Sequence, residues 1–170
     1  MRGLWIIVFM CSSVAGQKLS VVAAKMDGKS IPGAPIFCAT AYAEVDCDAH
    51  AAILTAVLAR YPVERLGEWK FILVRTAEWK KVMKEIGGGP DTPAFSALQV
   101  RTTVFEDALF APTAKRKAYL LKAFKVADMT AMVELAVAHE LGHAMCHTVS
   151  EARANEYAAE LIAGRAVKCE

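Results

Sequence analysis

The residues best suited to chemistry are His139, Glu140 and His143, which belong to the run His-Glu-Leu-Gly-His. On a helix, histidines four residues apart lie one turn apart on the same face, so both imidazoles can reach one metal ion. Glu140 would lie beside that ion, within reach of a water bound to it. The spacing is typical of a zinc site, and it predicts Zn²⁺ held by His139 and His143 with Glu140 as the catalytic base.

A catalytic zinc ion needs a third protein ligand and keeps one position for water. His147 continues the spacing, but on a straight helix it would lie about 12 Å from His139 along the axis, and no glycine stands between positions 143 and 147 to turn the chain. Glu156 is a further carboxylate in the stretch that follows. Glu151 is the favoured third ligand, because a tight hairpin of two helices would place position 151 opposite position 143.

A purely structural role for Glu151 remains open at this point. The run Thr148-Val-Ser-Glu151 is also a capping box, in which the carboxylate only satisfies the N-terminus of a helix. The sequence therefore offers Glu151 both as a metal ligand and as a helix cap.

The surrounding pattern predicts the elements that must position these residues. The expected order is helix, strand, helix, strands and then three helices, which is an α+β layout. Residues 94–106 alternate with a period of two, as expected of a half-buried strand or a hairpin. The remaining predictions are a helix over 48–61, a buried strand over 70–75, a helix over 77–86 capped by Thr76, a basic helix over 114–125 and an alanine-rich helical region from Asp128 onward.

Length and composition narrow the class of protein. The 170 residues have room for one domain, with 17–170 as the mature unit. Residues 17–37 are expected to form a strand or two, or else 17–45 form a loosely packed N-terminal segment. A hydrophobic fraction of 55% excludes disorder. A net charge of +2 is far from the surplus that drives binding to phosphate backbones, so no nucleic-acid partner is expected.

Residues 1–16 have the order of a secretory signal peptide. A positive start (Met1, Arg2) precedes the apolar run 4–10 and the small-residue stretch 11–16. Cleavage is expected after Ala15 or Gly16. The uncharged segment 3–16 is shorter than the roughly 20 residues that span a bilayer, so we predict a secreted or periplasmic protein with no membrane partner after cleavage.

Signal removal takes Cys11 and leaves an even number of cysteines, which makes two disulfides plausible in an oxidising compartment. Cys38 and Cys47 are close in sequence and are favoured as one pair. If Cys146 ends one helix and Cys169 follows the next, the rise of that helix would put them too far apart for a disulfide, so the pairing of these two cysteines stays open.

The stretch His-Glu-Leu-Gly-His-Ala-Met-Cys-His, followed by the run Glu-Ala-Arg-Ala-Asn-Glu-Tyr-Ala-Ala-Glu-Leu from Glu151, resembles the metal-binding helix pair of ImmA/IrrE-type, gluzincin-like HExxH zinc metallopeptidases. The resemblance covers about residues 130–162. It implies a small zincin-like domain in which a short antiparallel or mixed sheet packs on an active-site helix and a second metal-ligand helix follows. It also implies Glu151 as third zinc ligand and Asn155 as a residue that orients a ligand histidine. The chain departs from the usual pattern of that family in two respects. Only seven residues separate His143 from Glu151, which is fewer than usual, and the chain is expected to be exported, whereas many of those relatives are intracellular.

The expected function is that of a secreted zinc-dependent metallopeptidase that hydrolyses peptide bonds in a protein or peptide substrate. Glu140 would take a proton from the zinc-activated water and deliver it to the leaving nitrogen. The strand over 97–106 would be an edge strand onto which a peptide could add. The alternative is a secreted binding or structural module whose zinc site is purely structural, closed by a fourth ligand such as His147.

Overall fold

The computed structural model describes residues 13–24, 26, 28–31, 33–39, 44–89 and 92–169, and its centre is a mixed five-stranded sheet with the order β1-β2-β3-β5-β4. The strands β2, β3 and β5 run parallel, and β1 and β4 pair antiparallel at the two edges. The strands are β1 (Gly28–Ser30), β2 (Ile36–Ala39), β3 (Lys70–Val74), β4 (Ala94–Ala97) and β5 (Thr102–Glu106). The helices are α1 (Ser13–Ala24), α2 (Glu44–Leu58), α3 (Thr76–Ile86), α4 (Ala114–Phe124), α5 (Met129–Cys146) and α6 (Glu151–Ile162). The predicted α+β class with a mixed sheet is confirmed.

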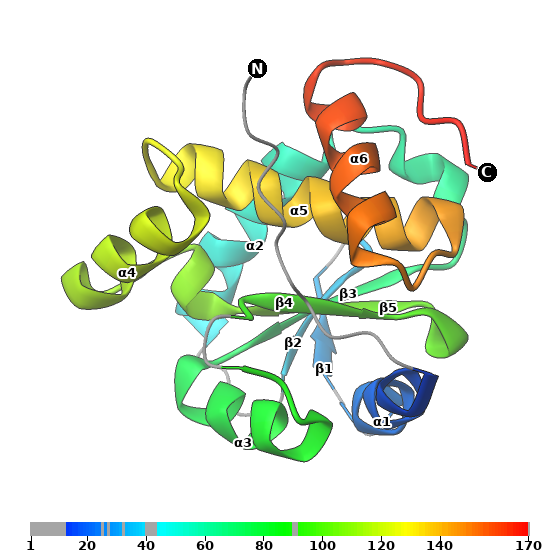
Figure 1. Ribbon diagram of the computed structural model, residues 1–170. Helices are drawn as coiled ribbons and strands as arrows, with labels where there is room; N and C mark the ends of the chain where they lie inside the picture. Colours follow the sequence, from blue (N-terminus) through cyan, green and yellow to red (C-terminus); the bar gives the residue numbers. More distant parts are fainter. Residues whose placement is uncertain are drawn as a thin grey trace.

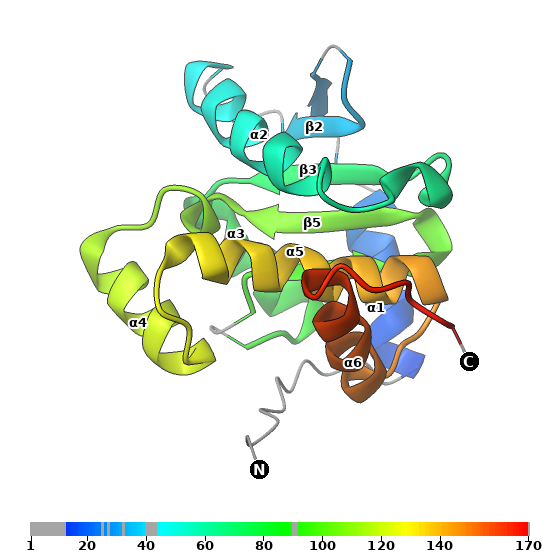
Figure 2. The same ribbon diagram turned by 90° about the horizontal axis from the view of Figure 1, so that it is seen from above.

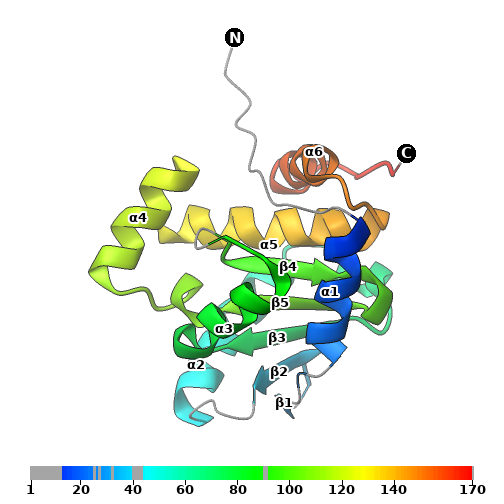
Figure 3. The same cartoon turned by 60° about the horizontal axis from the view of Figure 1, so that its bottom comes forward.

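Helices cover both faces of this sheet (Figure 1). In β3, Phe71 and Leu73 join the hydrophobic cluster formed with α2, α5 and α6. Ile72 and Val74 point to the other face and join the cluster formed with α1 and α3, and α1 crosses in front of the strands in Figure 3. Because both faces of β3 are covered, an unbroken apolar run suits it, which confirms the buried strand predicted near 70–75.

The helix α5 lies over the sheet between α2 and α6 (Figure 2). It begins with Asp128, whose side chain accepts a hydrogen bond from the amide of Ala131 at 2.9 Å. Most of its residues from Met132 to Ala144 are buried, because α5 has the sheet on one side and α6 on the other. The predicted helices of the final quarter are confirmed.

Residues 94–106 form a hairpin, not one strand. A 3-10 turn over Leu98–Val100 and a left-handed Arg101 (φ 49°) separate β4 from β5. All five residues of β5 are buried, so the half-buried strand predicted from the alternation is wrong, because β5 is an inner strand between β3 and β4. The edge strand on this side of the sheet is therefore β4, which corrects the docking strand expected at 97–106.

Three further expectations need correction. The chain from Ser13 to Ala24 is a helix, with Leu19 and Ala23 buried, which the sequence did not predict for the start of the segment 17–37. The strand or two expected in that segment correspond to β1 and β2 further along the chain. The helix predicted over 48–61 spans Glu44–Leu58. Thr76 is the first residue of α3 and does not cap it, because its hydroxyl donates to the Asp107 carboxylate in the loop after β5.

The predicted signal peptide lies largely outside the described residues, since its first twelve residues are not among them. The expected cleavage points after Ala15 and Gly16 fall within the first turn of α1. Among the residues that the structure describes, no helix is both long enough and apolar enough to cross a membrane.

Two cysteine pairs form disulfides. Cys38 and Cys47 join β2 to α2 with a Cα–Cα distance of 6.1 Å, as predicted. Cys146 and Cys169 are also paired, with a Cα–Cα distance of 5.1 Å, so the expectation that they are too far apart is wrong. The rise of α6 carries the chain about 18 Å away from the end of α5. The seven residues after α6 can span up to about 23 Å, which is enough to bring Cys169 back to Cys146. Val167, in this returning segment, is buried against the core.

The Cys146–Cys169 disulfide is expected to stabilise the fold by closing a loop with a sequence separation of 23 residues. The double variant Cys146→Ser/Cys169→Ser should lose about 3 kcal/mol of unfolding free energy, mainly because its unfolded chain regains conformational freedom. The measurement is urea unfolding of both proteins under oxidising conditions, with a chelator present to remove metal effects. A loss below about 1 kcal/mol would show that this disulfide does not constrain the chain as argued.

Candidate metal centre

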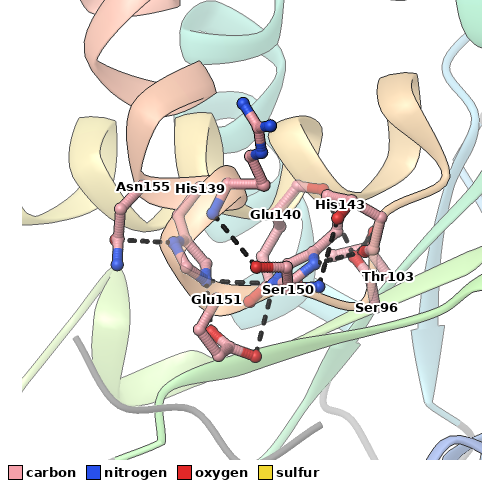
Figure 4. Close-up of polar contacts among 10 residues, drawn as sticks. Ser96, Thr103, His139, Glu140, His143, Ser150, Glu151 and Asn155 are labelled. Carbon is pink, nitrogen blue, oxygen red and sulfur yellow. Dashed lines mark hydrogen bonds and ion pairs between the residues drawn. The ribbon is translucent and has the colours of Figure 1, made fainter. Parts of the chain in front are cut away.

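The helix α5 brings His139 and His143 together deep in the protein. Their side chains are 1% and 6% exposed, and their Nε2 atoms lie 3.1 Å apart. The helical spacing of four residues places both rings on the side of α5 that faces α6, as Figure 4 shows. The sequence prediction that both histidines face one point is confirmed.

A short turn joins α5 to α6 and places Glu151 at the same point. His147 ends α5 in the left-handed conformation (φ 48°), and the Ser150 side chain caps α6 by accepting from the amide of Arg153. Glu151 is the first residue of α6. Its carboxylate oxygens lie 3.1 Å from His139 Nε2 and 3.5 Å from His143 Nε2.

The structure thus shows which of the candidate third ligands lies next to His139 and His143. Ser150 caps α6 and the Glu151 carboxylate turns to the histidines, so the capping-box role of Glu151 is wrong. Glu156 is exposed and pairs with Arg153. His147 is exposed at the helix end. Within the described parts of the chain, the donor atoms that converge within 4.8 Å belong to His139, His143 and Glu151.

Close contact between α5 and α6 is what allows this convergence. At Gly142, a Cβ atom would lie 2.9 Å from the carbonyl oxygen of Ala154 and 3.1 Å from the Cβ of Tyr157. Real Cβ atoms essentially never come that close to a backbone atom, so only glycine fits there. Ala154 is fully buried on the facing side. The glycine inside the His-Glu-Leu-Gly-His run is therefore a packing requirement.

The outer nitrogens of both rings have oxygen partners. His139 Nδ1 lies 3.0 Å from Asn155 Oδ1, so Asn155 contacts a histidine of the cluster, as the resemblance implied. His143 Nδ1 lies 2.7 Å from the carbonyl oxygen of Thr148, and a carbonyl only accepts, so this nitrogen carries a proton. The Thr148 contact uses a backbone atom, and no residue type in the sequence could have indicated it.

This arrangement leaves a site that requires a cation. With Nδ1 protonated, each neutral ring presents the lone pair of Nε2, and the two lone pairs face each other and the Glu151 carboxylate. A proton or a metal ion must lie among them. Burial would lower the pKa of His143, but hydrogen bonding to Glu151 and the charges of Glu140 and Glu151 raise it to about 8. Burial would raise the pKa of Glu151, and its hydrogen bonds with the two histidines lower it below its usual value.

Glu140 points from α5 toward the sheet, next to this cluster (Figure 4). It is 3% exposed, and within the described structure its Oε2 atom has no hydrogen-bond partner. Burial raises the pKa of its carboxyl, and electrostatic interaction with His139 and His143 acts in the opposite direction. A buried carboxylate oxygen without a partner costs free energy, so this position suits a group that binds a water or a substrate.

Comparisons with protein-family models, with curated proteins and with solved structures found no match to this chain. His139, His143 and Glu151 form a buried group that could hold a metal ion. The fit is supported by the two Nε2 atoms 3.1 Å apart, the adjacent Glu151 carboxylate and the unpartnered oxygen of Glu140.

Replacing Gly142 with alanine tests the close contact of the helices. At an unhindered helical position this change stabilises a protein by up to about 1 kcal/mol. Here the added Cβ would meet Ala154, so we expect a net loss of about 1–3 kcal/mol and weaker binding of added Zn²⁺. Urea unfolding in chelator and a zinc titration measure the two effects. A gain in stability would contradict the contact.

Replacing Glu151 with alanine tests the third donor, and Glu156→Ala is the matched control on the same helix. Glu151→Ala should weaken binding of added Zn²⁺ by more than the roughly 10- to 100-fold that loss of an indirect hydrogen-bond partner costs. Glu156→Ala should bind as the unchanged protein does, because Glu156 is exposed. Competition with a coloured chelator gives the affinities. Equal affinity in both variants would remove Glu151 from the site.

Proposed function

We propose that this chain is a secreted zinc-dependent metallopeptidase. The observation that carries the proposal is the convergence of His139, His143 and Glu151 next to a buried Glu140 whose Oε2 has no partner in the described structure. A metal ion held by three side chains beside a carboxylate with one oxygen available to accept a proton is the arrangement that hydrolytic zinc enzymes need. The resemblance of residues 130–162 to ImmA/IrrE-type peptidases and the mixed sheet under α5 support the same reading.

Zinc is the metal that the donor set favours. Two imidazole nitrogens and one carboxylate are a recurrent ligand set of catalytic zinc, whereas calcium and magnesium take mainly oxygen ligands. A structural zinc site is closed by a fourth protein ligand. The cluster found among the described residues has three members, and His147 is exposed beyond it. This favours a catalytic site over the purely structural alternative.

In the proposed mechanism, Glu140 moves the proton. When bound, zinc supplies the Lewis acidity that polarises the scissile carbonyl and acidifies the attacking water. Glu140 accepts a proton from that water at its unpartnered Oε2 and later delivers it to the leaving nitrogen. Asn155 and the Thr148 carbonyl contact the outer nitrogens of the histidine rings and would keep both Nε2 atoms oriented to hold the ion.

The edge strand β4 is the proposed docking strand for an extended peptide. It pairs with β5 along one side and ends the sheet, so strand addition would take place on its other side. Ser96 in β4 donates a hydrogen bond to the backbone carbonyl of Glu140 at 3.4 Å, which puts this strand directly beside the proposed base.

Export is the remaining part of the proposal. The expected signal peptide at 1–16 indicates secretion or transfer to the periplasm. The disulfides Cys38–Cys47 and Cys146–Cys169 are consistent with an oxidising compartment. The proposed substrates are therefore proteins or peptides outside the cytoplasm.

The variant Glu140→Gln tests the mechanism separately from metal binding. The amide keeps the shape of the side chain but cannot accept the proton, so kcat should fall by at least about 100-fold. Zinc content, measured by elemental mass spectrometry, should stay at the level of the unchanged protein. If the variant cleaved the same peptides at the rate of the unchanged protein, the proposed role of Glu140 would be wrong.

A further inference from the structure

The helix α4 and the short segments on either side of it form the most basic stretch of the chain. Residues 111–127 contain no aspartate or glutamate, and their lysines and arginines are Lys115, Arg116, Lys117, Lys122 and Lys125. The whole chain has a net charge of only +2, so the rest of the chain carries a small negative net charge. Lys115, Lys117 and Lys122 are called the α4 lysines below.

The α4 lysines are available to an external anion. All three are exposed, and no ion pair within the described residues involves any of them. Arg116 differs from them, because it is partly buried and pairs with the buried Glu106 at 2.6 Å. The charge of Arg116 is thus balanced inside the protein, whereas the α4 lysines can bind a carboxylate without breaking an existing ion pair.

The outward surface of α4 suits an acidic peptide better than a membrane. A helix that lies in a membrane interface needs an apolar face exposed to the lipid. In α4, Leu120 is fully buried, and Leu121 and Phe124 are partly buried against the core. Its exposed large apolar residue is Tyr119, and the guanidinium of Arg116 lies 5.6 Å from the centre of that ring. The surface that remains is made of lysines and alanines, which attract carboxylates but have little to insert into lipid.

The end of α4 lies beside the candidate metal centre. The helix packs against α5 and stands clear of the sheet, near the start of α5 (Figures 1 and 2). Its last residue, Phe124, borders the same small hollow as Ala94, His139 and Glu140. Ala94 begins the edge strand β4, so a peptide that adds to β4 and continues beyond its start would run toward α4. From Phe124 back to Lys115 the helix rises about 14 Å, which about four extended residues cover.

We propose that the α4 lysines bind acidic side chains of the substrate on one side of the scissile bond, an inference that rests on the proposed peptidase function. The substrate class is proteins or peptides with a cluster of aspartates or glutamates about two to five positions from the cleaved bond. Attraction between the lysines and these carboxylates would speed association and would weaken as salt is added. Because α4 adjoins the start of β4, the preference should be confined to one side of the bond.

Three matched peptides test the preference. They share one bond that the protein cleaves, and they carry a block of four glutamates before it, the same block after it, or four glutamines in place of the block. With the zinc-loaded protein, one of the two glutamate peptides should have a kcat/KM at least about 10-fold above that of the glutamine peptide at low salt. The advantage should shrink in about 0.5 M NaCl. An equal advantage for both glutamate peptides, or none for either, would overturn the proposal.

Charge reversal on α4 locates the effect. The variant Lys115→Glu/Lys117→Glu/Lys122→Glu should lose the advantage of the glutamate peptide, because its helix would repel the carboxylates. Its kcat for the glutamine peptide should stay at the level of the unchanged protein, since none of the α4 lysines belongs to the candidate metal centre.

The matched control reverses three exposed lysines on α3, in the variant Lys80→Glu/Lys81→Glu/Lys84→Glu. It changes the net charge by the same amount, but α3 covers the opposite face of the sheet from α5 (Figure 1). This control should keep the advantage of the glutamate peptide. Loss of the advantage in both variants would show an effect of net charge alone and would overturn the role of α4.

A binding measurement without turnover separates this proposal from the peptidase function. Fluorescence anisotropy with the metal-free protein compares a labelled peptide of four glutamates flanked by glycines with its glutamine counterpart. The glutamate peptide should bind at least about 10-fold more tightly, and the α4 variant should lose that difference while the α3 variant keeps it. Such binding without cleavage of any peptide would support the α4 surface and count against the peptidase function.

Two other outcomes would overturn the α4 surface. Cleavage of peptides with no acidic preference, together with equal binding of the two labelled peptides, would remove the surface and leave the peptidase function standing. Sedimentation with phosphatidylserine vesicles, with no preference for the glutamate peptide, would assign the α4 lysines to a membrane instead.

Discussion

The close approach of α5 and α6 at Gly142 and Ala154 is the contact on which the rest of the site depends. A side chain at position 142 would meet the backbone of α6 and force the helices apart. Glu151 and Asn155 lie on α6, and both reach His139 at about 3 Å. A shift of one or two ångströms between the helices would break both contacts. The absence of a side chain at position 142 therefore keeps Glu151, a candidate metal ligand, and Asn155 within reach of His139.

The turn between α5 and α6 also helps to hold the two helices together. His147 adopts the left-handed conformation that ends many helices, although it is not a glycine, and this turns the chain back within a few residues. The turn also points the Thr148 carbonyl at His143 Nδ1. At the other end of α6, the chain returns and the Cys146–Cys169 disulfide ties it to the end of α5. The two helices that supply donors are thus held by a turn, a packed contact and a covalent link.

The site was more predictable from sequence than the fold around it. Helical periodicity and donor chemistry are local, so His139, His143 and Glu140 could be placed from their spacing, and the hairpin geometry favoured Glu151. The Thr148 contact could not be predicted, because it depends on a backbone carbonyl and a left-handed residue. The Cys146–Cys169 pair was missed because the return of the tail after α6 is tertiary. The burial of β5 was missed because alternating polar residues such as Thr103 find partners inside the protein.

Hydrogen bonds explain how the polar residues Ser96 and Thr103 of the β4–β5 hairpin can lie in the interior of the protein. Trp69 Nε1 donates to Thr103 Oγ1 at 3.0 Å, Thr103 lies 2.8 Å from Ser96 Oγ, and Ser96 donates to the backbone carbonyl of Glu140. Each hydroxyl accepts from one neighbour and donates to the next, so the buried groups are satisfied in series. The series runs from the residue before β3 across β5 and β4 to α5. This series connects the sheet to α5 at the backbone of Glu140. The position of Glu140 relative to the edge strand β4 is therefore set by hydrogen bonds as well as by apolar packing.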